Sequence, residues 1–297
     1  MKLTNKFDLP ETIVNVLKRP QYSRGNSHIS VTELLSAPQI VQLRIKHNDE
    51  LEQDASEMVW SLFGTAIHNV LEHGKGDNHI VEERVFVDLD GWRVSGQIDL
   101  QEVYEDGIEL KDYKMTSAWS VQQEKTDWVE QLNIYAWLIQ KAKGVTIKSL
   151  QIVAIVRDWN RRDAVNKESY PKAPIVKIDI PLWDFADAEA FVRGKIHSHS
   201  SASLNAQIGH DLPECTPDDM WERPTTYAVK KIGGVRAKRV FDTAEEADEM
   251  LSTLRDHEVV VRPGIRMRCA SFCNVNQFCK QYQQYLEQAG HMIESGD

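Results

Sequence analysis

The sequence has no run of eighteen apolar residues, so a membrane-spanning helix is not expected. Its first residues, MKLTNKFDLPETIV, lack the basic and then apolar pattern of a secretory signal. A cytoplasmic protein is therefore expected, in which the four cysteines do not form disulfides. The sequence also has no internal repeat and no low-complexity tract. With 297 residues, 41% of them apolar, the chain can bury one large core or two modest ones.

Positive charge is in short supply. The 35 Lys and Arg residues face 45 Asp and Glu residues, which gives a net charge of −10. This balance argues against general electrostatic adhesion to nucleic acid. It does not exclude an enzyme that acts on DNA, because charge can be segregated and bound metal ions offset local carboxylates. Taken alone, the acidity indicates only a soluble protein.

Apolar periodicity predicts an α/β core with a mixed central sheet. Helices are expected at 57–73, 124–143 and 183–197, and strands at 80–87, around 96–100 and 109–115, and at 147–156 and 174–180. Another helix should start near Ser30 or Thr32, and residues 198–225 are expected to be a loop. Four regions follow: a peripheral segment at 1–27, a core at 28–200, a linker with a basic hairpin and helix at 201–268, and a cysteine-rich segment at 269–297.

Three charged residues lie on two strands that an acidic turn, Glu105-Asp106-Gly107, joins into a hairpin. Asp112 and Lys114 alternate to the same face of their strand, and the hairpin can bring Asp99 beside them. Buried charges are costly unless they are paired or bind a metal ion. This trio therefore suits a hard divalent cation and an attacking water. Glu109-x-Lys111, on the opposite strand face, is an alternative acid–lysine pair.

The flanking residues complete an ordered set: His68, Gly96-x-x-Asp99, Asp112-x-Lys114 and Gln131-x-x-x-Tyr135. This set resembles the PD-(D/E)XK nuclease superfamily, and within it the RecB-like exonucleases. The resemblance covers roughly residues 28–182. It implies a restriction-endonuclease-like core, with a mixed central sheet flanked by helices and a small C-terminal region that carries the cysteines.

The resemblance also implies roles for these residues. His68, Asp99, Asp112 and the backbone carbonyl of Tyr113 would bind Mg²⁺ or Mn²⁺, and Lys114 would orient the attacking water or help to deprotonate it. Gln131 and Tyr135 would bind DNA near its end. From the residues alone, His68 and Glu72 could instead be a surface pair, and Gln131 and Tyr135 a polar edge of a buried helix.

Three further residues near this set are candidates for the site. Trp119 and Trp128 could stack on unpaired bases or could pack in the protein interior. Glu83, on the strand before Asp99, is a candidate additional metal ligand.

The cysteines are unevenly placed, with Cys215 alone and Cys269, Cys273 and Cys279 within eleven residues. Three clustered ligands and one remote ligand favour a [4Fe–4S] cluster, while zinc and no metal remain alternatives. The C-terminal run resembles that of AddB-type and CRISPR-adaptation nucleases, although its first gap is three residues rather than two. In those families the fourth cysteine usually precedes the nuclease motifs. Here Ala37-Pro38 stands in that region, so Cys215 would have to be the fourth ligand.

A basic hairpin is predicted around a Gly233-Gly234 turn. Its cations could grip a DNA backbone or could simply protect a solvated edge strand from pairing. They are Lys230, Lys231, Arg236, Lys238 and Arg239.

Together these features predict a metal-dependent DNA exonuclease that hydrolyses phosphodiester bonds. The resemblance implies a role in DNA replication, recombination or repair, including that of viruses. One alternative is a CRISPR-adaptation nuclease that trims DNA, which a ring-like homo-oligomer and a partner integrase would favour. Another is a catalytically silent module that binds DNA ends, against which the intact Asp99, Asp112 and Lys114 argue.

Overall fold

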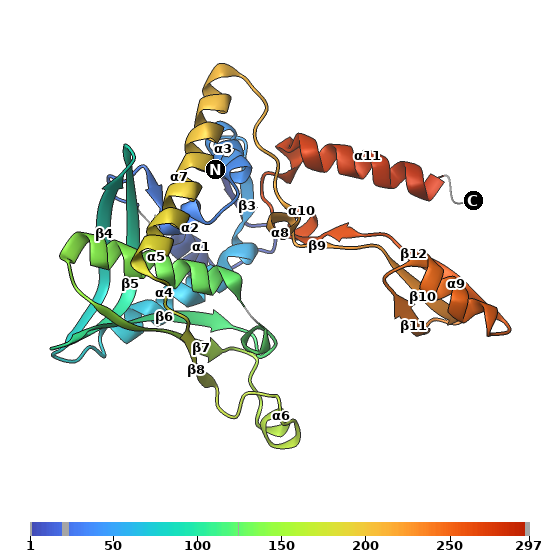
Figure 1. Ribbon diagram of the computed structural model, residues 1–297, viewed down its shortest axis with the longest axis horizontal. Coiled ribbons are helices and arrows are strands. Elements are labelled where there is room, and N and C mark those ends of the chain that lie inside the picture. The colour runs from blue at the N-terminus through green and yellow to red at the C-terminus, as the bar shows by residue number, and fades with distance from the viewer. Residues whose placement is uncertain (1, 20–23, 124, 295–297) are drawn as a thin grey trace. The chain divides into compact units, whose positions relative to one another are not determined.

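The computed structural model describes residues 2–19, 24–123 and 125–294, with side chains as far as 288 (Figure 1). The chain forms two compact units. The first contains residues 1–36 and 52–210, and the second contains residues 37–51 and 211–297. Among the described residues, no helix combines the length and the apolar character that crossing a bilayer requires.

A mixed sheet of six strands forms the centre of the first unit, which confirms the predicted α/β class. The strands β4, β5 and β6 are antiparallel neighbours, β7 is parallel to β6, β8 is antiparallel to β7, and β2 lies parallel to the start of β5. Their bounds are β2 Ile29–Ser30, β4 His79–Leu89, β5 Trp92–Tyr104, β6 Gly107–Thr116, β7 Ile147–Val156 and β8 Ile175–Ile180. Asp90 and Gly91, both with positive φ, make the tight turn between β4 and β5.

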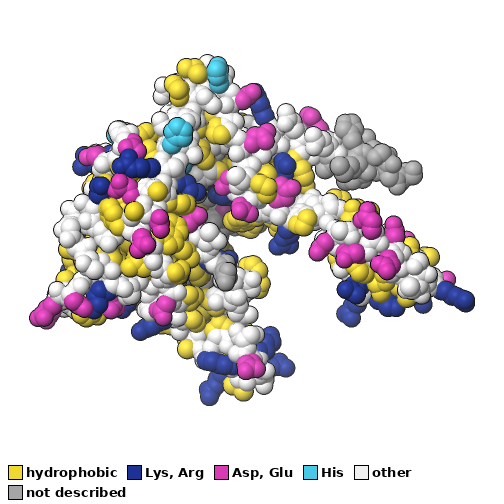
Figure 2. All heavy atoms as spheres, in the orientation of Figure 1, with side chains coloured by type: hydrophobic (Ala, Val, Ile, Leu, Met, Phe, Trp, Pro, Cys, Tyr) yellow, Lys and Arg dark blue, Asp and Glu magenta, His cyan; other side chains and the backbone are white. Residues whose placement is uncertain are grey.

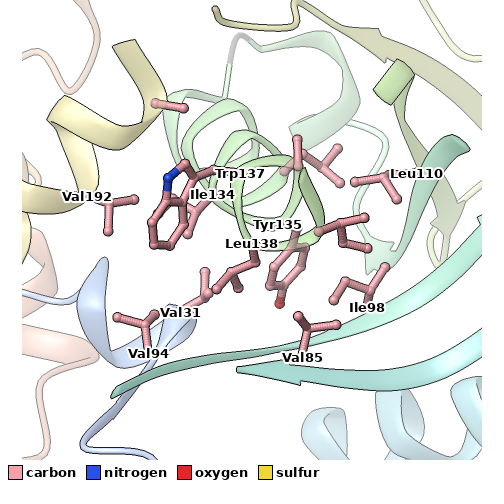
Figure 3. Close-up of a cluster of buried hydrophobic side chains, with 14 of the residues drawn as sticks. Val31, Val85, Val94, Ile98, Leu110, Ile134, Tyr135, Trp137, Leu138 and Val192 are labelled. Carbon is pink, nitrogen blue, oxygen red and sulfur yellow. The ribbon is translucent and has the colours of Figure 1, made fainter. Parts of the chain in front are cut away.

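Helices cover both faces of this sheet. On one face, α5 (Thr126–Lys143) packs on the strands, with α7 (Phe185–Ile208) and α2 (Val31–Leu34) beside it. Figure 3 shows the buried side chains of this layer, which come from α5, the three antiparallel strands, α2 and α7. On β6, Tyr113 points away from the face of Asp112 and Lys114, and its ring meets the ring of His68 on α4 (Val59–Glu72). Helix α4 therefore lies on the opposite face from α5.

Local signals set several element ends. Ser30 caps α2, because its hydroxyl accepts the N–H of Glu33 while the Glu33 carboxylate accepts the N–H of Ser30. This confirms the predicted helix start. Two short strands, β1 (Lys2–Thr4) and β3 (Glu52–Asp54), pair in parallel beside α1 (Glu11–Leu17) and the short helix Ala55–Met58.

The predicted loop at 198–225 is wrong over its first part, since α7 continues to Ile208. His199 and Ala202 are buried against the unit's core, with exposed fractions of 1% and 0%. Packing of these side chains stabilises the helix where the serine-rich composition suggested a loop. The helix ends at Gly209, which adopts the left-handed conformation that a helix C-terminus favours.

The second unit combines the cysteine segment with a small sheet. Strands β10 (Thr226–Lys231), β11 (Ala237–Phe241) and β12 (His257–Arg262) form an antiparallel sheet next to α9 (Ala244–Ser252). The predicted hairpin is confirmed. Thr243 caps α9, because its hydroxyl accepts the N–H of Glu246. The remaining elements are α3 (Pro38–Lys46), α8 (Pro217–Met220), the strand pair β9 (Glu222–Arg223) and β13 (Ile265–Arg266), α10 (Met267–Ser271), the turn Asn276–Phe278 and α11 (Lys280–Glu294).

At Gly96 on β5, the side chains of α5 approach the backbone of the sheet closely. A Cβ at this position would lie 2.7 Å from Leu138 and 2.8 Å from the ring of Tyr135, both closer than real Cβ contacts allow. The glycine of the Gly96-x-x-Asp99 motif therefore allows α5 to contact β5.

Replacing Gly96 by alanine should lower the free energy of unfolding by about 2 kcal/mol, because an added methyl group in a packed interface forces side chains apart. Urea unfolding of the two proteins measures this difference. Gly194→Ala is the matched control, since nothing lies within 4 Å of the Cβ site in that helix and alanine is the better helix former. Equal effects of the two substitutions would contradict the packing role of Gly96.

Candidate metal and active site

The strands β5 and β6 separate at the point where the predicted acidic residues lie. Their ladder runs from Tyr104 opposite Gly107 to Leu100 opposite Lys111, and Asp99 and Asp112 come next on the two strands. Here the N–H of Tyr113 donates to Oδ2 of Asp99 at 2.7 Å. A side-chain carboxylate thus takes the place of a backbone acceptor, and it holds Asp99 at the fork between the strands.

Three side chains with metal-binding atoms converge at this fork. Nδ1 of His68 lies 3.1 Å from Oε1 of Glu82 and 3.5 Å from Oδ1 of Asp99. One donor atom from each residue lies within 4.8 Å of the other two. Gln97 donates to the other oxygen of Glu82 at 2.7 Å and accepts from Arg84 at 2.6 Å. The Glu82 carboxylate is therefore held from behind.

Glu82 is the site residue that sequence reasoning missed. It lies opposite Asp99 on β4 with a φ of 50°, a left-handed conformation that is strained for a glutamate inside a strand. Glu83, the candidate additional ligand, does not belong to this group, because its carboxylate pairs with Lys143 at 2.5 Å and accepts from Gln101 at 2.6 Å. The two adjacent glutamates are visible in the sequence, but the backbone conformation that selects Glu82 is not.

Asp112 and Lys114 point toward α5, where they meet the predicted Gln131 and Tyr135. The Lys114 ammonium lies 2.7 Å from Oδ2 of Asp112 and donates to Oε1 of Gln131 at 3.0 Å. The amide of Gln131 donates to the Tyr135 hydroxyl at 2.8 Å and lies 3.5 Å from Oδ1 of Asp112. These four side chains form one hydrogen-bonded network, which we call the lysine network.

The structure brings the alternative pair to a different place. Lys111 pairs with Glu102 at 2.5 Å, and Glu109 lies opposite Glu102 on the hairpin. The geometry therefore joins Asp112 and Lys114, rather than Glu109 and Lys111, to Asp99. Trp128 is 8% exposed and belongs to the core, whereas Trp119 is 63% exposed.

Burial and charge make the site electrostatically strained. Burial, and then the charge of Asp112, raise the pKa of Asp99 to about 8. The hydrogen bond to Glu82 raises the pKa of His68 above its ordinary value, although burial opposes this change. Burial also opposes the charged form of Lys114, but the pairing with Asp112 outweighs it and raises the pKa of Lys114. The site thus gathers more negative charge than its own cations neutralise.

The donor set fits a hard divalent cation. Carboxylate oxygens are the preferred ligands of Mg²⁺ and Mn²⁺, and a histidine nitrogen is compatible with Mn²⁺ and other transition metals. A bound cation would also stabilise the ionised form of Asp99, whose proton is otherwise favoured by burial. The His68, Glu82 and Asp99 group is the only one of this kind among the described residues.

The four cysteines line one cavity in the second unit, together with Gln39 of α3. The thiols of Cys215 and Cys279 donate to Oε1 of Gln39 at 3.4 and 3.3 Å. Burial, followed by nearby acidic and thiol groups, raises the pKa of Cys215 to about 12. All four cysteines are described, yet no three of their sulfur atoms lie within 4.8 Å of one another.

The basic hairpin belongs to the second unit. Lys230 pairs with Glu258 at 3.2 Å, and the guanidinium of Arg239 stacks over Phe241 at 4.8 Å. Lys231, Arg236 and Lys238 are exposed. Figure 2 shows Lys and Arg side chains on one side of this small lobe and acidic side chains on another.

The chain was compared with known proteins. Among solved structures it resembles that of SSO0001 at 18% identity and a TM-score of 0.42, covering 62% of this chain and 81% of the other. It also resembles an alkaline exonuclease, LHK-Exo, from Laribacter hongkongensis at 14% identity and a TM-score of 0.27, covering 59% and 93%. At such scores the likeness carries no weight for function, and no curated protein matched. The family model of the PD-(D/E)XK nuclease superfamily matches residues 57–280 and so includes every residue of the fork and of the lysine network. This chain belongs to the PD-(D/E)XK nuclease superfamily.

Proposed function

We propose that this protein is a metal-dependent exonuclease of the RecB-like branch that hydrolyses phosphodiester bonds from DNA ends. One observation carries the proposal. The His68, Glu82 and Asp99 donor group and the Asp112–Lys114 pair meet where β5 and β6 separate. Such an activity would serve DNA replication, recombination or repair.

The metal ligands we propose are His68, Glu82, Asp99, Asp112 and the backbone carbonyl of Tyr113. When bound, Mg²⁺ or Mn²⁺ would lower the pKa of an attacking water and offset phosphate charge. Groups of the protein determine where the cation would bind. The Tyr113 N–H fixes Asp99, and Gln97 fixes Glu82, so two carboxylates are oriented before any cation arrives.

Lys114 acts as a cation rather than as a base. Its raised pKa keeps the ammonium protonated at neutral pH, so it can donate hydrogen bonds to an attacking water or to a phosphate oxygen. Asp112 and Gln131 hold it in position at 2.7 and 3.0 Å. Positive charge aimed at the reacting phosphate stabilises the negative charge that develops during hydrolysis.

Gln131 and Tyr135 place an amide and a phenol one turn apart on α5, next to Lys114. We propose that Gln131 contacts the terminal nucleotides and determines which phosphate reaches the metal, while the hydroxyl of Tyr135, a side chain that is 5% exposed, accepts from Gln131 and holds it in place. Positioning of this kind lowers the activation barrier without taking part in bond breaking.

The cysteine cavity supports a [4Fe–4S] cluster over zinc. A tetrahedral zinc site with Zn–S bonds of about 2.3 Å holds its sulfurs about 3.8 Å apart. The four thiols surround one cavity, and no three of them lie within 4.8 Å of one another. An iron–sulfur cubane is larger than one zinc ion and holds its four thiolates farther apart. This spacing favours the larger group, with Cys215 as its fourth ligand.

Metal-free protein should lose stability as the pH rises from 5 to 8. The folded state keeps Asp99 protonated up to a pKa of about 8, while the unfolded state releases this proton near 3.8. His68, with its raised pKa, acts in the same direction, since its contribution is lost as the pH rises through the folded value. The expected decrease in the free energy of unfolding is on the order of 3 kcal/mol, measured by urea unfolding.

Two controls test the cause. Asp99→Asn should remove most of this pH dependence, and added Mg²⁺ should stabilise the wild-type protein most at pH 8. Identical pH profiles of wild type and variant would refute the assignment of the effect to Asp99.

With Mg²⁺ or Mn²⁺, the protein should progressively degrade end-labelled linear DNA and leave covalently closed circles intact. Asp112→Ala and Lys114→Ala should each lower the rate by about 100-fold or more, because each removes charge from the reacting centre. Only Asp112→Ala should also weaken metal binding. Gln131→Ala should slow digestion and leave metal affinity unchanged.

Glu109→Ala is the matched control, because Glu109 lies on the same strand but away from the fork. It should cut at the wild-type rate. An inactive Glu109 variant together with an active Asp112 variant would contradict the assignment of Asp112. The acid of the site would then lie on the opposite face of β6. Rapid nicking of closed circles would indicate an endonuclease instead.

Protein purified without oxygen should be brown and contain about four irons per chain. Cys273→Ser should lose this iron and speed hydrogen exchange in residues 211–288 more than in residues 52–210, because metal-binding energy stabilises the fold around the site. Colourless protein with one zinc per chain would show that the cysteines bind zinc instead of an iron–sulfur cluster.

A further inference from the structure

Helix α4 presents an apolar surface to solvent beside the candidate site. None of the described residues of α4 is buried, and Trp60 and Phe63 are 55% and 46% exposed. Their rings meet edge to face at 5.8 Å. The sequence from Val59 to Leu71 contains no acidic residue. A contiguous exposed apolar patch often marks an interaction site.

Cations accompany the exposed aromatic rings. The guanidinium of Arg157 lies over the Trp60 ring at 4.6 Å, and Nζ of Lys125 lies over the Trp119 ring at 5.1 Å. Trp119 directly follows Ala118, whose N–H donates to Asp158 at 2.6 Å. Trp60 of α4 and Trp119 after β6 therefore both lie next to the corner formed by Arg157 and Asp158.

This corner lies close to the lysine network. The N–H of Arg157 donates to the carbonyl of Thr116 at 2.9 Å, and Thr116 is two residues beyond Lys114 on β6. Trp60 precedes His68 by eight residues on α4. At about 1.5 Å per residue this is roughly 12 Å, or three to four stacked nucleotides at about 3.4 Å each.

A basic lobe adjoins the same corner. Residues 157–172, which include α6 (Arg161–Asn166), carry five basic and three acidic side chains in a chain whose net charge is −10. Arg161, Arg162 and Lys167 are exposed. Figure 2 shows Lys and Arg side chains gathered at the tip of this lobe. A small core of Ala118, Val156, Ala164 and Tyr170 joins the lobe to the turn that carries Trp119.

We propose that Trp60, Phe63 and Trp119 form a stacking track for single-stranded DNA that leads to the fork, with Arg157 and the α6 lobe contacting its phosphates. Exposed bases offer flat faces to aromatic rings, whereas a duplex hides these faces in its own stack. The positive charges beside the rings match a nucleic acid better than an apolar protein surface. The inference extends the proposed function by naming unpaired DNA as the preferred substrate.

The test uses full-length Asp112→Asn protein, so that DNA is bound without being cut. Fluorescence anisotropy would compare a labelled single-stranded oligonucleotide with its duplex, in Mg²⁺. Trp60→Ala and Trp119→Ala should each weaken single-strand binding by about tenfold, as loss of one stacked base predicts. Trp60→Phe should restore most of the affinity, because phenylalanine keeps a stacking face.

Val70→Ala is the matched control, since Val70 is 71% exposed on the same helix but has no aromatic ring. It should bind as Asp112→Asn alone does. Arg161→Ala and Arg162→Ala should each reduce the slope of log affinity against log salt by about 0.7 for each phosphate that the protein no longer neutralises.

Unchanged single-strand affinity in both tryptophan variants would overturn the inference, as would equal losses for single strand and duplex. The two proposals can fail separately. If the tryptophans contribute to DNA binding but the wild-type protein cuts no DNA, only the proposed exonuclease activity is contradicted. If the wild-type protein cuts DNA but the tryptophan variants bind it normally, only the proposed stacking track is contradicted.

Discussion

The site depends on the separation of β5 and β6 beyond the Leu100–Lys111 pair. At that point the Asp99 carboxylate, rather than a backbone carbonyl, accepts the N–H of Tyr113. The same separation places Asp99 close to Asp112, and burial, followed by the charge of Asp112, raises the pKa of Asp99 to about 8. His68 from α4 and Lys114 from β6 offset part of this charge. A divalent cation at the fork would remove the remaining conflict, so the strain of the free protein and its proposed chemistry have one cause.

A second constraint connects two motifs that look independent in the sequence. Gly96 has no side chain, and this absence lets the Tyr135 ring and Leu138 lie against β5. The hydroxyl of Tyr135 then accepts from Gln131, which in turn holds Lys114. The glycine before Asp99 therefore positions the lysine through α5. This contact explains why Gly96 occurs in the same motif as Gln131 and Tyr135 of α5.

Much of the nuclease unit could be predicted because its signals are local. Strands β7 and β8 follow apolar patterns, and Ser30 and Thr243 are caps that hydrogen-bond within three residues. Three features could not be predicted, because each depends on contacts distant in sequence. Packing of His199 extends α7, residues 37–51 join residues 211–297 in one unit, and a strained backbone turns Glu82 toward His68. Alternation along a strand predicts that Asp112 and Lys114 share one face, as they do. The same rule fails at Glu82, because that residue leaves the extended conformation.

The two candidate metal sites differ in the chemistry of their donors, and this difference would let one chain hold both kinds of metal. The fork offers carboxylate oxygens and one imidazole, which suit hard or borderline divalent ions that exchange with solvent. The cavity of the second unit offers four thiols, which are soft ligands and bind only when deprotonated. Burial raises the thiol pKa of Cys215 to about 12, so without a metal this thiol stays neutral and compatible with its apolar surroundings. An ion that suits the fork is a poor match for the thiols, and a cluster that satisfies four thiolates leaves no open position for a substrate. A metal bound by the cysteines would therefore stabilise their own unit without competing for the ion proposed to act at the fork.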